Sequence, residues 1–143
     1  MGLSGKKIFI DPGHGGTAAQ GRLRCGSYNV GTSGTLSGNE KDSVLTIGIE
    51  LKGILESYGA IVNISRTTDT ALCLGERAEL ANTWGPTGVR YQDLQVLRDT
   101  QMPAILLELG FMSNAGDDAF IAEYEGKLDF INGIVMGLQD YFI

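Results

Sequence analysis

The sequence predicts an α/β fold, with an open, mostly parallel sheet flanked by helices on both faces. Two short apolar runs, at residues 8–10 and 61–66, have the composition of strands. Between them, apolar residues recur at spacings of three and four, which is the pattern of an amphipathic helix. This order makes a βαβ unit with a right-handed crossover. The two strands are therefore predicted to be parallel and to end at the same edge of the sheet.

The first predicted strand ends in a turn that carries the only histidine of the chain. Residues 8–10 form an unbroken Ile-Phe-Ile run, which favours a strand buried on both faces. Pro12 and Gly13 then end the strand, because proline has no N–H to donate and glycine tolerates positive φ. His14 is thereby placed just beyond the carboxyl end of a strand, where open α/β sheets bind ligands. An imidazole at that position is a candidate for metal binding or for acid–base chemistry.

A long glycine-rich segment separates this turn from the first predicted helix. Residues 15–38 are rich in Gly, Ser and Thr without a helical or strand period, and they are predicted to form a functional loop or a flap. The run 39–42, Asn-Glu-Lys-Asp, has the acidic residues of a helix start, and Gly59 supplies the C-terminal stop. The apolar face of this helix is predicted to contain Val44, Ile47, Leu51, Ile54, Leu55 and Tyr58.

The middle of the chain is predicted to hold a short helix and a short extended segment. Arg66 ends the second strand and lies at the same edge of the sheet as the histidine turn. Residues 75–83 are predicted to form a helix with Ala78 and Ala81 facing inward. Residues 94–98, Leu-Gln-Val-Leu-Arg, are predicted to be a short strand or an extended segment.

The last third of the chain is predicted to contain one more strand and two helices. Residues 104–107 are the most apolar strand candidate, and they end at Glu108. Ser113 and Asn114 are predicted to cap a helix near 115–124, and Gly126 is predicted to separate that helix from the final one. The inner face of the final helix is predicted to contain Leu128, Ile131, Ile134 or Val135, Leu138 and Phe142.

Chemically capable side chains are predicted to converge at one edge of this sheet. Asp11 and His14 follow the first strand, Arg66 ends the second and Glu108 ends the strand 104–107, while Glu40 is brought back by its helix. Glu40 could instead only stabilise a helix N-terminus, which is worth roughly 0.3–1 kcal/mol. Arg66 could be a solvated strand end or the partner of Glu108. A carboxylate buried beside an apolar strand is costly unless it is paired, metal-bound or catalytic, which favours a functional Glu108.

Composition and charge limit the possible classes of protein. The 143 residues are predicted to form a single domain, 1–143, and the net charge of −6 argues against non-specific nucleic-acid binding. No run of eighteen apolar residues exists, so no membrane span is predicted, and residues 1–5 are too short and polar for a signal peptide. Cys25 and Cys73 both lie in predicted loops; a disulfide is permitted, but free thiols are expected.

Four blocks of sequence resemble, in the same order, the zinc-dependent N-acetylmuramoyl-L-alanine amidases of the type 3 family. The resemblance implies an α/β domain that hydrolyses the amide between N-acetylmuramic acid and the first L-alanine of the peptidoglycan stem peptide. It also implies peptidoglycan as the partner and an extracellular or cell-wall location; the missing leader is compatible with a phage lysin or a trimmed mature domain. Separately from the resemblance, a monomer is expected. The blocks are residues 10–16, 39–42, 65–82 (with its Ser-Arg, Leu-Gly-Glu-Arg and Ala-Asn elements) and 107–114.

The resemblance also assigns roles to individual residues. His14 and Glu40 match positions that bind Zn²⁺ in that family, and Glu108 matches the glutamate expected to act as general base. Zinc lowers the pKa of a bound water towards 7, and a nearby carboxylate can take the proton of that water. Asp11 and Arg66 are assigned to substrate binding or to support of the metal ligands.

The chain departs from the family pattern in one respect. The pattern contains a further strand whose histidine is a third zinc ligand, whereas this sequence has no second histidine and only eleven residues between Asn82 and Leu94. The domain is therefore predicted to be shortened relative to the family. Catalytic zinc normally has three protein ligands, and the conceivable substitutes here are Cys73, Glu76 and Asp93.

Two functional hypotheses follow, and a third is weaker. The chain is either a zinc amidase with an altered centre or a non-catalytic relative that still binds peptidoglycan or a protein partner. An autolysin, a sporulation hydrolase and a phage lysin all remain open for the enzyme. A phosphate-binding turn at 11–16 is disfavoured, because no Lys-Ser/Thr pair follows it as in a P-loop.

Overall fold

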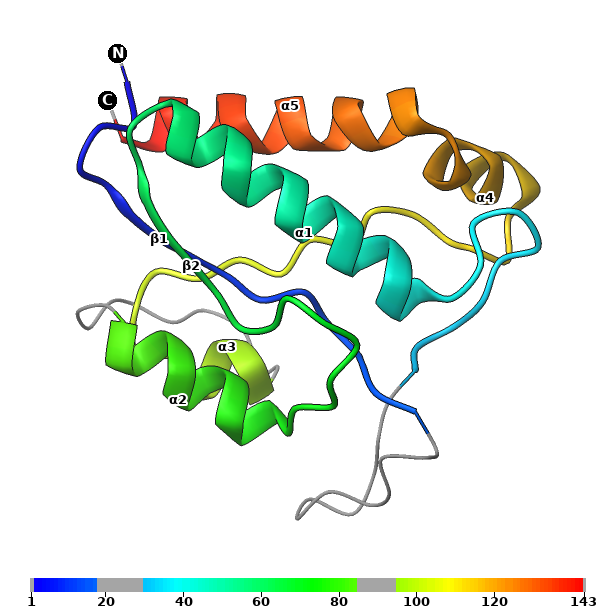
Figure 1. Cartoon of the computed structure of the whole chain (residues 1–143), viewed down its shortest axis with the longest axis horizontal. Helices are drawn as coiled ribbons and strands as arrows, with labels where there is room; N and C mark the ends of the chain where they lie inside the picture. Colours follow the sequence, from blue (N-terminus) through cyan, green and yellow to red (C-terminus); the bar gives the residue numbers. More distant parts are fainter. Residues whose placement is uncertain (1, 18–29, 85–94, 143) are drawn as a thin grey trace.

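The computed structural model describes residues 2–17, 30–84 and 95–142. A pair of parallel strands runs through the middle of the molecule, with α1 and α5 on one side and α2 and α3 on the other (Figure 1). This arrangement confirms the predicted α/β class. The elements are β1 (Lys7–Ile10), α1 (Glu40–Ser57), β2 (Ile61–Ile64), α2 (Leu74–Trp84), α3 (Gln95–Asp99), α4 (Ala115–Ala122) and α5 (Tyr124–Tyr141).

The two strands pair in parallel, as the βαβ order predicts. The register places Lys7 beside Ile61 and Ile10 beside Ile64. The expectation that β1 is buried on both faces is wrong, because Lys7 is exposed and the next three residues are only half-buried. The physical reason is that β1 has a hydrogen-bonded neighbour on one edge only within the described part of the chain.

Helix α1 follows its sequence pattern closely. Asn39 is the N-cap, Glu40 and Asp42 lie in the first turn, and Gly59 has the positive φ of 85° expected just after a helix end. Tyr58 was predicted on the apolar face but is 47% exposed, because it lies at the C-cap beyond the last packed turn. The buried apolar residues of the helix are Ile47, Leu51 and Leu55.

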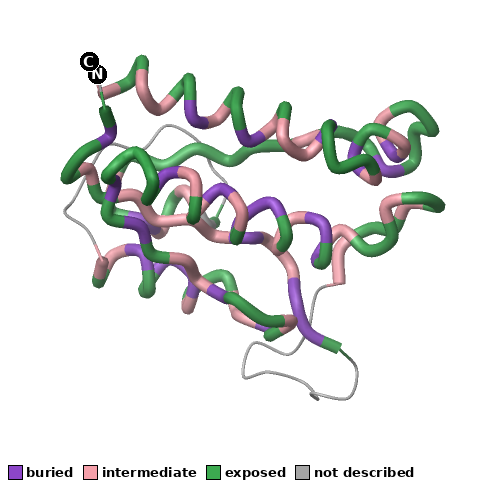
Figure 2. The backbone as a smooth tube through the Cα atoms, turned by 45° about the horizontal axis from the view of Figure 1, so that its top comes forward, coloured by how far each residue is buried: buried purple, intermediate pink, exposed green. Residues whose placement is uncertain are grey.

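The core lies between α1, α5 and the strand pair. Ile131 and Val135 of α5 pack with Leu51 and Leu55 of α1, and Val62 of β2 joins the same cluster. Figure 2 shows buried residues recurring along the inward side of α1 and α5, which is the pattern the helical spacing predicts. Partly buried residues against this core include Ile8, Ile10, Leu109, Phe130, Ile134, Leu138 and Phe142.

Residues 95–99 form helix α3, so the predicted strand or extended segment at 94–98 is wrong. The side-chain amide of Asn82 donates to the carbonyl of Asp99 at 3.0 Å, and the backbone N–H of Gln101 donates to Asn82 Oδ1 at 2.5 Å. These contacts hold the segment against α2, and they depend on a residue too distant in sequence for a local pattern to reveal. Leu94 itself lies outside the described residues.

The apolar segment 104–107 is extended but is not a strand of the sheet, contrary to the prediction. Residues 102–110 make no backbone hydrogen bond with any other described residue. Ile105 is 72% exposed, and Leu106 and Leu107 are 47% and 46% exposed. The composition is that of a buried strand, but a strand needs a neighbouring edge, and none pairs with this segment in the described structure.

The C-terminal helices differ from prediction only at their boundary. Asn114 Oδ1 accepts hydrogen bonds from the N–H groups of Gly116 and Asp117, which confirms the predicted cap of α4. Gly126 lies inside α5 rather than between the helices, and the break falls at Glu123. A Cβ on Gly126 would lie 2.0 Å from the carbonyl oxygen of Phe120, so this glycine permits close packing instead of ending a helix.

Cys73 is disulfide-bonded, so the expectation of free thiols is wrong. The one other cysteine of the sequence, Cys25, lies outside the described residues. A pair of cysteines distant in sequence carries no local signal of bonding, which is why sequence alone left both states open. Within the ranges that the structure describes, none of the helices combines the length and the apolar character needed to cross a bilayer.

Candidate functional site

The turn after β1 brings His14 into contact with the start of α1. His14 is the one non-glycine residue with positive φ in the described ranges, at 57°. Its Nε2 atom lies 3.0 Å from Oε1 of Glu40, and about a quarter of each side chain is exposed. The structure therefore brings together the two residues that the sequence paired as candidate metal ligands.

The second oxygen of the Glu40 carboxylate is held by the loop before α1. Glu40 Oε2 accepts a hydrogen bond from the N–H of Thr32 at 2.8 Å, and the N–H of Glu40 donates to the carbonyl of Thr32 at 2.9 Å. Gly31, with a φ of 74°, approaches so closely that a Cβ would lie 2.4 Å from Glu40 Oε2. Glu40 thus does more than stabilise a helix N-terminus, since its carboxylate is fixed by both the loop and the imidazole.

The loop that fixes Glu40 is itself anchored to α4 by Asp118. The buried carboxylate of Asp118 accepts hydrogen bonds from the N–H groups of Leu36 and Ser37 at 2.9 Å and from Ser37 Oγ at 2.5 Å. These bonds, with that of the Ser37 hydroxyl the largest cause, lower the pKa of Asp118 to about 2. Sequence analysis missed this residue, because nothing local distinguishes it from an ordinary acid in the first turn of a helix.

Arg66 is buried beneath the His14 turn. It is only 4% exposed, and its guanidinium donates to the backbone carbonyls of Pro12 and Gly13 at 3.0 and 2.7 Å. It also donates to the carbonyl of Lys41 at 2.8 Å. Burial lowers the pKa of Arg66, and the neighbouring positive charge of Arg77 lowers it further. Arg66 is therefore neither a solvated strand end nor, among its contacts in the described structure, a partner of Glu108.

Asp11 is held in a partly buried ion pair. Its Oδ1 accepts hydrogen bonds from Arg77 Nη1 at 2.6 Å and from Ser65 Oγ at 2.5 Å. Arg77 comes from α2 and is itself 4% exposed. Arg77 is not among the site residues that the sequence predicts. Its neighbour Ala78 is predicted to face inward, and an arginine next to an inward-facing position is the signal that could have pointed to a buried role.

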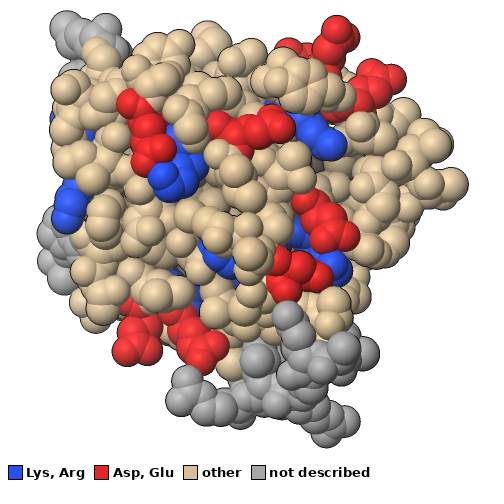
Figure 3. All heavy atoms as spheres, in the orientation of Figure 1, with Lys and Arg blue, Asp and Glu red and all other residues tan. Residues whose placement is uncertain are grey.

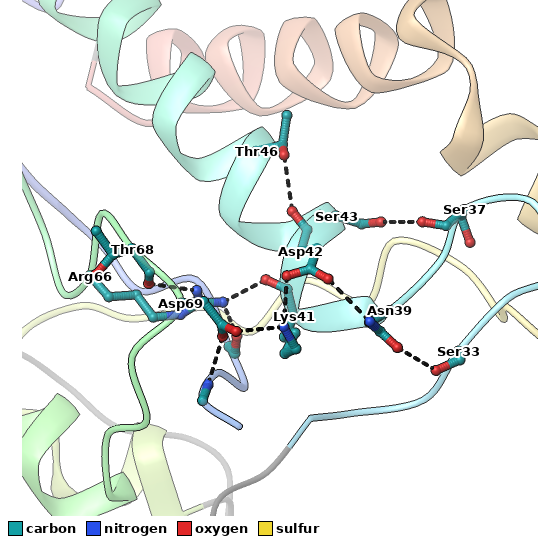
Figure 4. Close-up of polar contacts among 12 residues, drawn as sticks. Ser33, Ser37, Asn39, Lys41, Asp42, Ser43, Thr46, Arg66, Thr68 and Asp69 are labelled. Carbon is teal, nitrogen blue, oxygen red and sulfur yellow. Dashed lines mark hydrogen bonds and ion pairs between the residues drawn. The ribbon is translucent and has the colours of Figure 1, made fainter. Parts of the chain in front are cut away.

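A second charge network links the loop after β2 to the first turn of α1 (Figure 4). Lys41 Nζ lies 2.7 Å from Asp69 Oδ2 and 2.9 Å from Asp42 Oδ1. Asp69 Oδ1 also accepts the N–H of Gly16 at 2.7 Å. The hydrogen bond that Lys41 donates to Asp69 lowers the pKa of Asp69 and raises the pKa of Lys41. On the face that Figure 3 shows, several basic side chains likewise lie next to acidic ones.

Glu108 lines the same surface pocket as Glu40. The pocket also contains Ile47, Leu107 and Ile121, so its wall is largely apolar around the two carboxylates. Glu108 itself is exposed, so the reasoning that a buried carboxylate must be paired does not apply to it. The pocket that it shares with Glu40 is what connects Glu108 to the candidate site.

The donor set at this site fits zinc chemistry but is short by one ligand among the residues that the structure describes. An imidazole nitrogen and a carboxylate oxygen are common zinc ligands, and catalytic zinc usually has three protein ligands. No group of three His, Cys, Asp or Glu side chains suited to a metal occurs among residues 2–17, 30–84 and 95–142. Of the conceivable substitutes, Cys73 is in a disulfide and Glu76 accepts the N–H of Cys73 at 3.0 Å, while Asp93 lies outside the described residues.

The chain is similar to known proteins over almost its whole length. A family model described as N-acetylmuramoyl-L-alanine amidase matches residues 8–87 and 86–140. The probable cell wall amidase LytH of Staphylococcus aureus is 30% identical over 182 aligned residues, which cover 98% of this chain and 60% of LytH. The chain thus spans about 60% of the length of that relative.

Solved structures agree with this match. An N-acetylmuramoyl-L-alanine amidase from Clostridium difficile 630 superimposes with a TM-score of 0.80 and 26% identity, covering 97% of both chains. The amidase AmiC2 of Nostoc punctiforme superimposes with a TM-score of 0.79 and 24% identity, covering 97% of this chain and 98% of its own.

The comparisons also show that the chain is shortened relative to its relatives. The LytH alignment is 182 positions long, and 98% of this chain is about 140 residues, so about 42 positions of LytH have no counterpart here. The family model matches in two pieces that meet at residues 86–87, which lie between Asn82 and Leu94, where the sequence predicts the shortening.

Proposed function

This chain belongs to the N-acetylmuramoyl-L-alanine amidase family, and we propose that it hydrolyses the amide between N-acetylmuramic acid and L-alanine in peptidoglycan. The observation that carries the proposal is the contact between His14 Nε2 and Glu40 Oε1 at 3.0 Å, in a site whose pocket wall also contains Glu108. The chain as a whole, 1–143, would be one catalytic domain that works as a monomer outside the cell or in its wall.

Each site residue has a role in this proposal. His14 and Glu40 would hold Zn²⁺, which when bound supplies a water of lowered pKa and polarises the scissile carbonyl. Glu108, exposed at the pocket, would take a proton from the attacking water and pass it to the leaving amine of L-alanine. Asp11 and Arg66 would support the His14 turn from beneath, since both are occupied by internal hydrogen bonds.

The experiment that tests this proposal measures new α-amino groups of L-alanine released from purified peptidoglycan. We expect release by the wild type with zinc present, and loss of at least about 100-fold in Glu108→Gln, as removal of a general base costs 10²–10⁴-fold. Glu125→Gln, which changes an acid in the first turn of α5, is the matched control and should keep full activity. Equal activity of Glu108→Gln and wild type would refute the assigned base.

A second candidate function rests on the ligand count. Two ligands in the described structure favour a relative that binds peptidoglycan without cleaving it. Metal analysis separates the two candidates: about one zinc per chain, lost in His14→Ala, supports the enzyme. Sedimentation with peptidoglycan that needs no metal and produces no new amino groups supports the binding protein.

A further inference from the structure

We infer that Arg77, acting together with Arg66, is a positioning residue for His14. The two guanidinium groups hold three consecutive backbone carbonyls, those of residues 12–14, and so fix the turn that directs the imidazole at Glu40. The inference rests on the proposed function only in taking the His14–Glu40 pair as the functional centre, and the positioning itself can be measured without any activity.

The turn needs external support because of its backbone conformation. His14 has a φ of 57°, in the left-handed region that residues with a side chain disfavour. Such a residue persists where its surroundings over-determine it. Gly15 follows with a φ of 127°, and a Cβ there would lie 2.4 Å from the carbonyl oxygen of Thr70, so the turn is also pressed against the loop after β2.

The support consists of charge-assisted hydrogen bonds to every carbonyl of the turn. The carbonyl of Pro12 accepts from Arg66 Nε at 3.0 Å and from Arg77 Nη1 at 2.7 Å. The carbonyl of Gly13 accepts from Arg66 Nη2 at 2.7 Å, and the carbonyl of His14 accepts from Arg77 Nη2. Bonds from charged donors are stronger than neutral ones, and loss of a donor would leave a carbonyl unsatisfied.

The two arginines reach the turn from different elements. Arg66 follows β2 and also donates to the carbonyl of Lys41, the residue next to Glu40 in α1. Arg77 projects from α2 and also donates to Asp11 Oδ1 at 2.6 Å. The guanidinium of Arg66 therefore connects the turn to α1, which carries Glu40, and the guanidinium of Arg77 connects the turn to α2 on the other side of the strand pair. Together they fix the position of His14 relative to Glu40.

Arginine is needed here because of its geometry. Nη1 and Nη2 of Arg77 engage Asp11, Pro12 and His14 at once, which needs a planar group with several donors in fixed directions. Lysine keeps the positive charge but presents a single ammonium on a flexible stem. The substitution Arg77→Lys thus removes the fork while it preserves the charge that balances Asp11.

The test uses NMR, because His14 is the single histidine of the chain and its ring signals need no further assignment. In wild type we expect a strong intraresidue nuclear Overhauser cross-peak between HN and Hα of residue 14, because positive φ brings these two protons close together. We also expect nuclear Overhauser cross-peaks between the His14 ring and Glu40. In folded Arg77→Lys both should weaken and the ring signals should shift. Arg98→Lys is the matched control, since Arg98 is exposed on α3, and it should leave them unchanged.

Folded Arg77→Lys with wild-type His14 signals would overturn the inference. If that variant does not fold, the arginine spectrum of ¹⁵N-labelled wild type decides. Resolved, slowly exchanging Nη signals for Arg66 and Arg77 support the hydrogen bonds to the turn, and averaged Nη signals for these two arginines refute the inference. Where the wild type cleaves peptidoglycan, kcat of Arg77→Lys should fall roughly 10- to 100-fold with little change in KM. A wild type without activity would refute the proposed reaction but would not change the conclusion drawn from the NMR result.

Discussion

Asp118 shows how one side chain can control a site that it does not touch. Its carboxylate binds the loop at Leu36 and Ser37, and the same loop presents Thr32 to Glu40. The connection runs from α4 through the loop to the first turn of α1. Individual residues of this kind decide how well the His14–Glu40 pair is held, although they carry no chemistry of their own.

Asp118→Asn should lower stability at neutral pH and change its pH dependence. The folded pKa of about 2 is below the ordinary value of 3.8, so the stabilisation is present above about pH 4 and is lost as pH falls towards 2. In the variant, this part of the acid-induced loss should be absent, because the amide does not titrate. Urea unfolding midpoints measured between pH 2 and pH 7 check the expectation.

The exposed Asp129 on α5 provides the control for that series. Asp129→Asn should follow the wild-type curve throughout. A wild-type slope between pH 4 and pH 2 that persists unchanged in Asp118→Asn would contradict the assigned role.

At the scale of elements, the segment 103–109 shows that an apolar composition does not by itself make a segment buried. Its sequence is as apolar as a central strand, yet Ile105 is 72% exposed, whereas Ile131 of α5 is fully buried. The same residue type therefore occupies opposite environments in two elements of one chain. Burial depends on a neighbouring element, which the sequence of a segment does not contain.

This contrast predicts that the same substitution lowers the free energy of unfolding by very different amounts at the two positions. Ile131→Ala should destabilise the protein by about 2–5 kcal/mol, because it leaves a cavity in the core. Ile105→Ala should change stability by no more than about 0.5 kcal/mol, because the side chain is largely in solvent. Chemical denaturation of the two variants beside wild type measures both values. A cost above about 2 kcal/mol for Ile105→Ala would mean that 103–109 is packed as a strand.

At the scale of the whole molecule, the sequence predicts correctly those features that depend on residues close together in the chain. The βαβ unit could be predicted because the spacing in 44–55 and the apolar runs beside it are encoded within short windows. The cap at Asn114 was predictable for the same reason. The convergence of His14 and Glu40 followed from the parallel order of the strands and from the family resemblance.

The remainder depended on contacts between distant residues. Arg77 reaches Asp11 across 66 positions and Asp118 reaches Ser37 across 81, and neither pairing leaves a periodic signal. The end of helix 95–99 is held by Asn82 of α2, a contact that the sequence of the segment does not contain, and the bonded state of Cys73 needed the fold to be known. The shortening could be predicted from the family pattern, but the exposure of 103–109 could not be seen until its neighbours were placed.

Within the described part of the chain the backbone of 102–110 has no hydrogen-bonded partner, and this has a consequence for exchange with solvent. Amides that are not hydrogen-bonded need no opening step, so they should take up deuterium at once, while α1 and α5 remain protected up to the free energy of unfolding. Hydrogen–deuterium exchange followed by mass spectrometry should therefore find full labelling of peptides from 103–109 at the earliest time point. Slow uptake there would reveal a bound strand, whether from a second molecule or from peptide captured during purification.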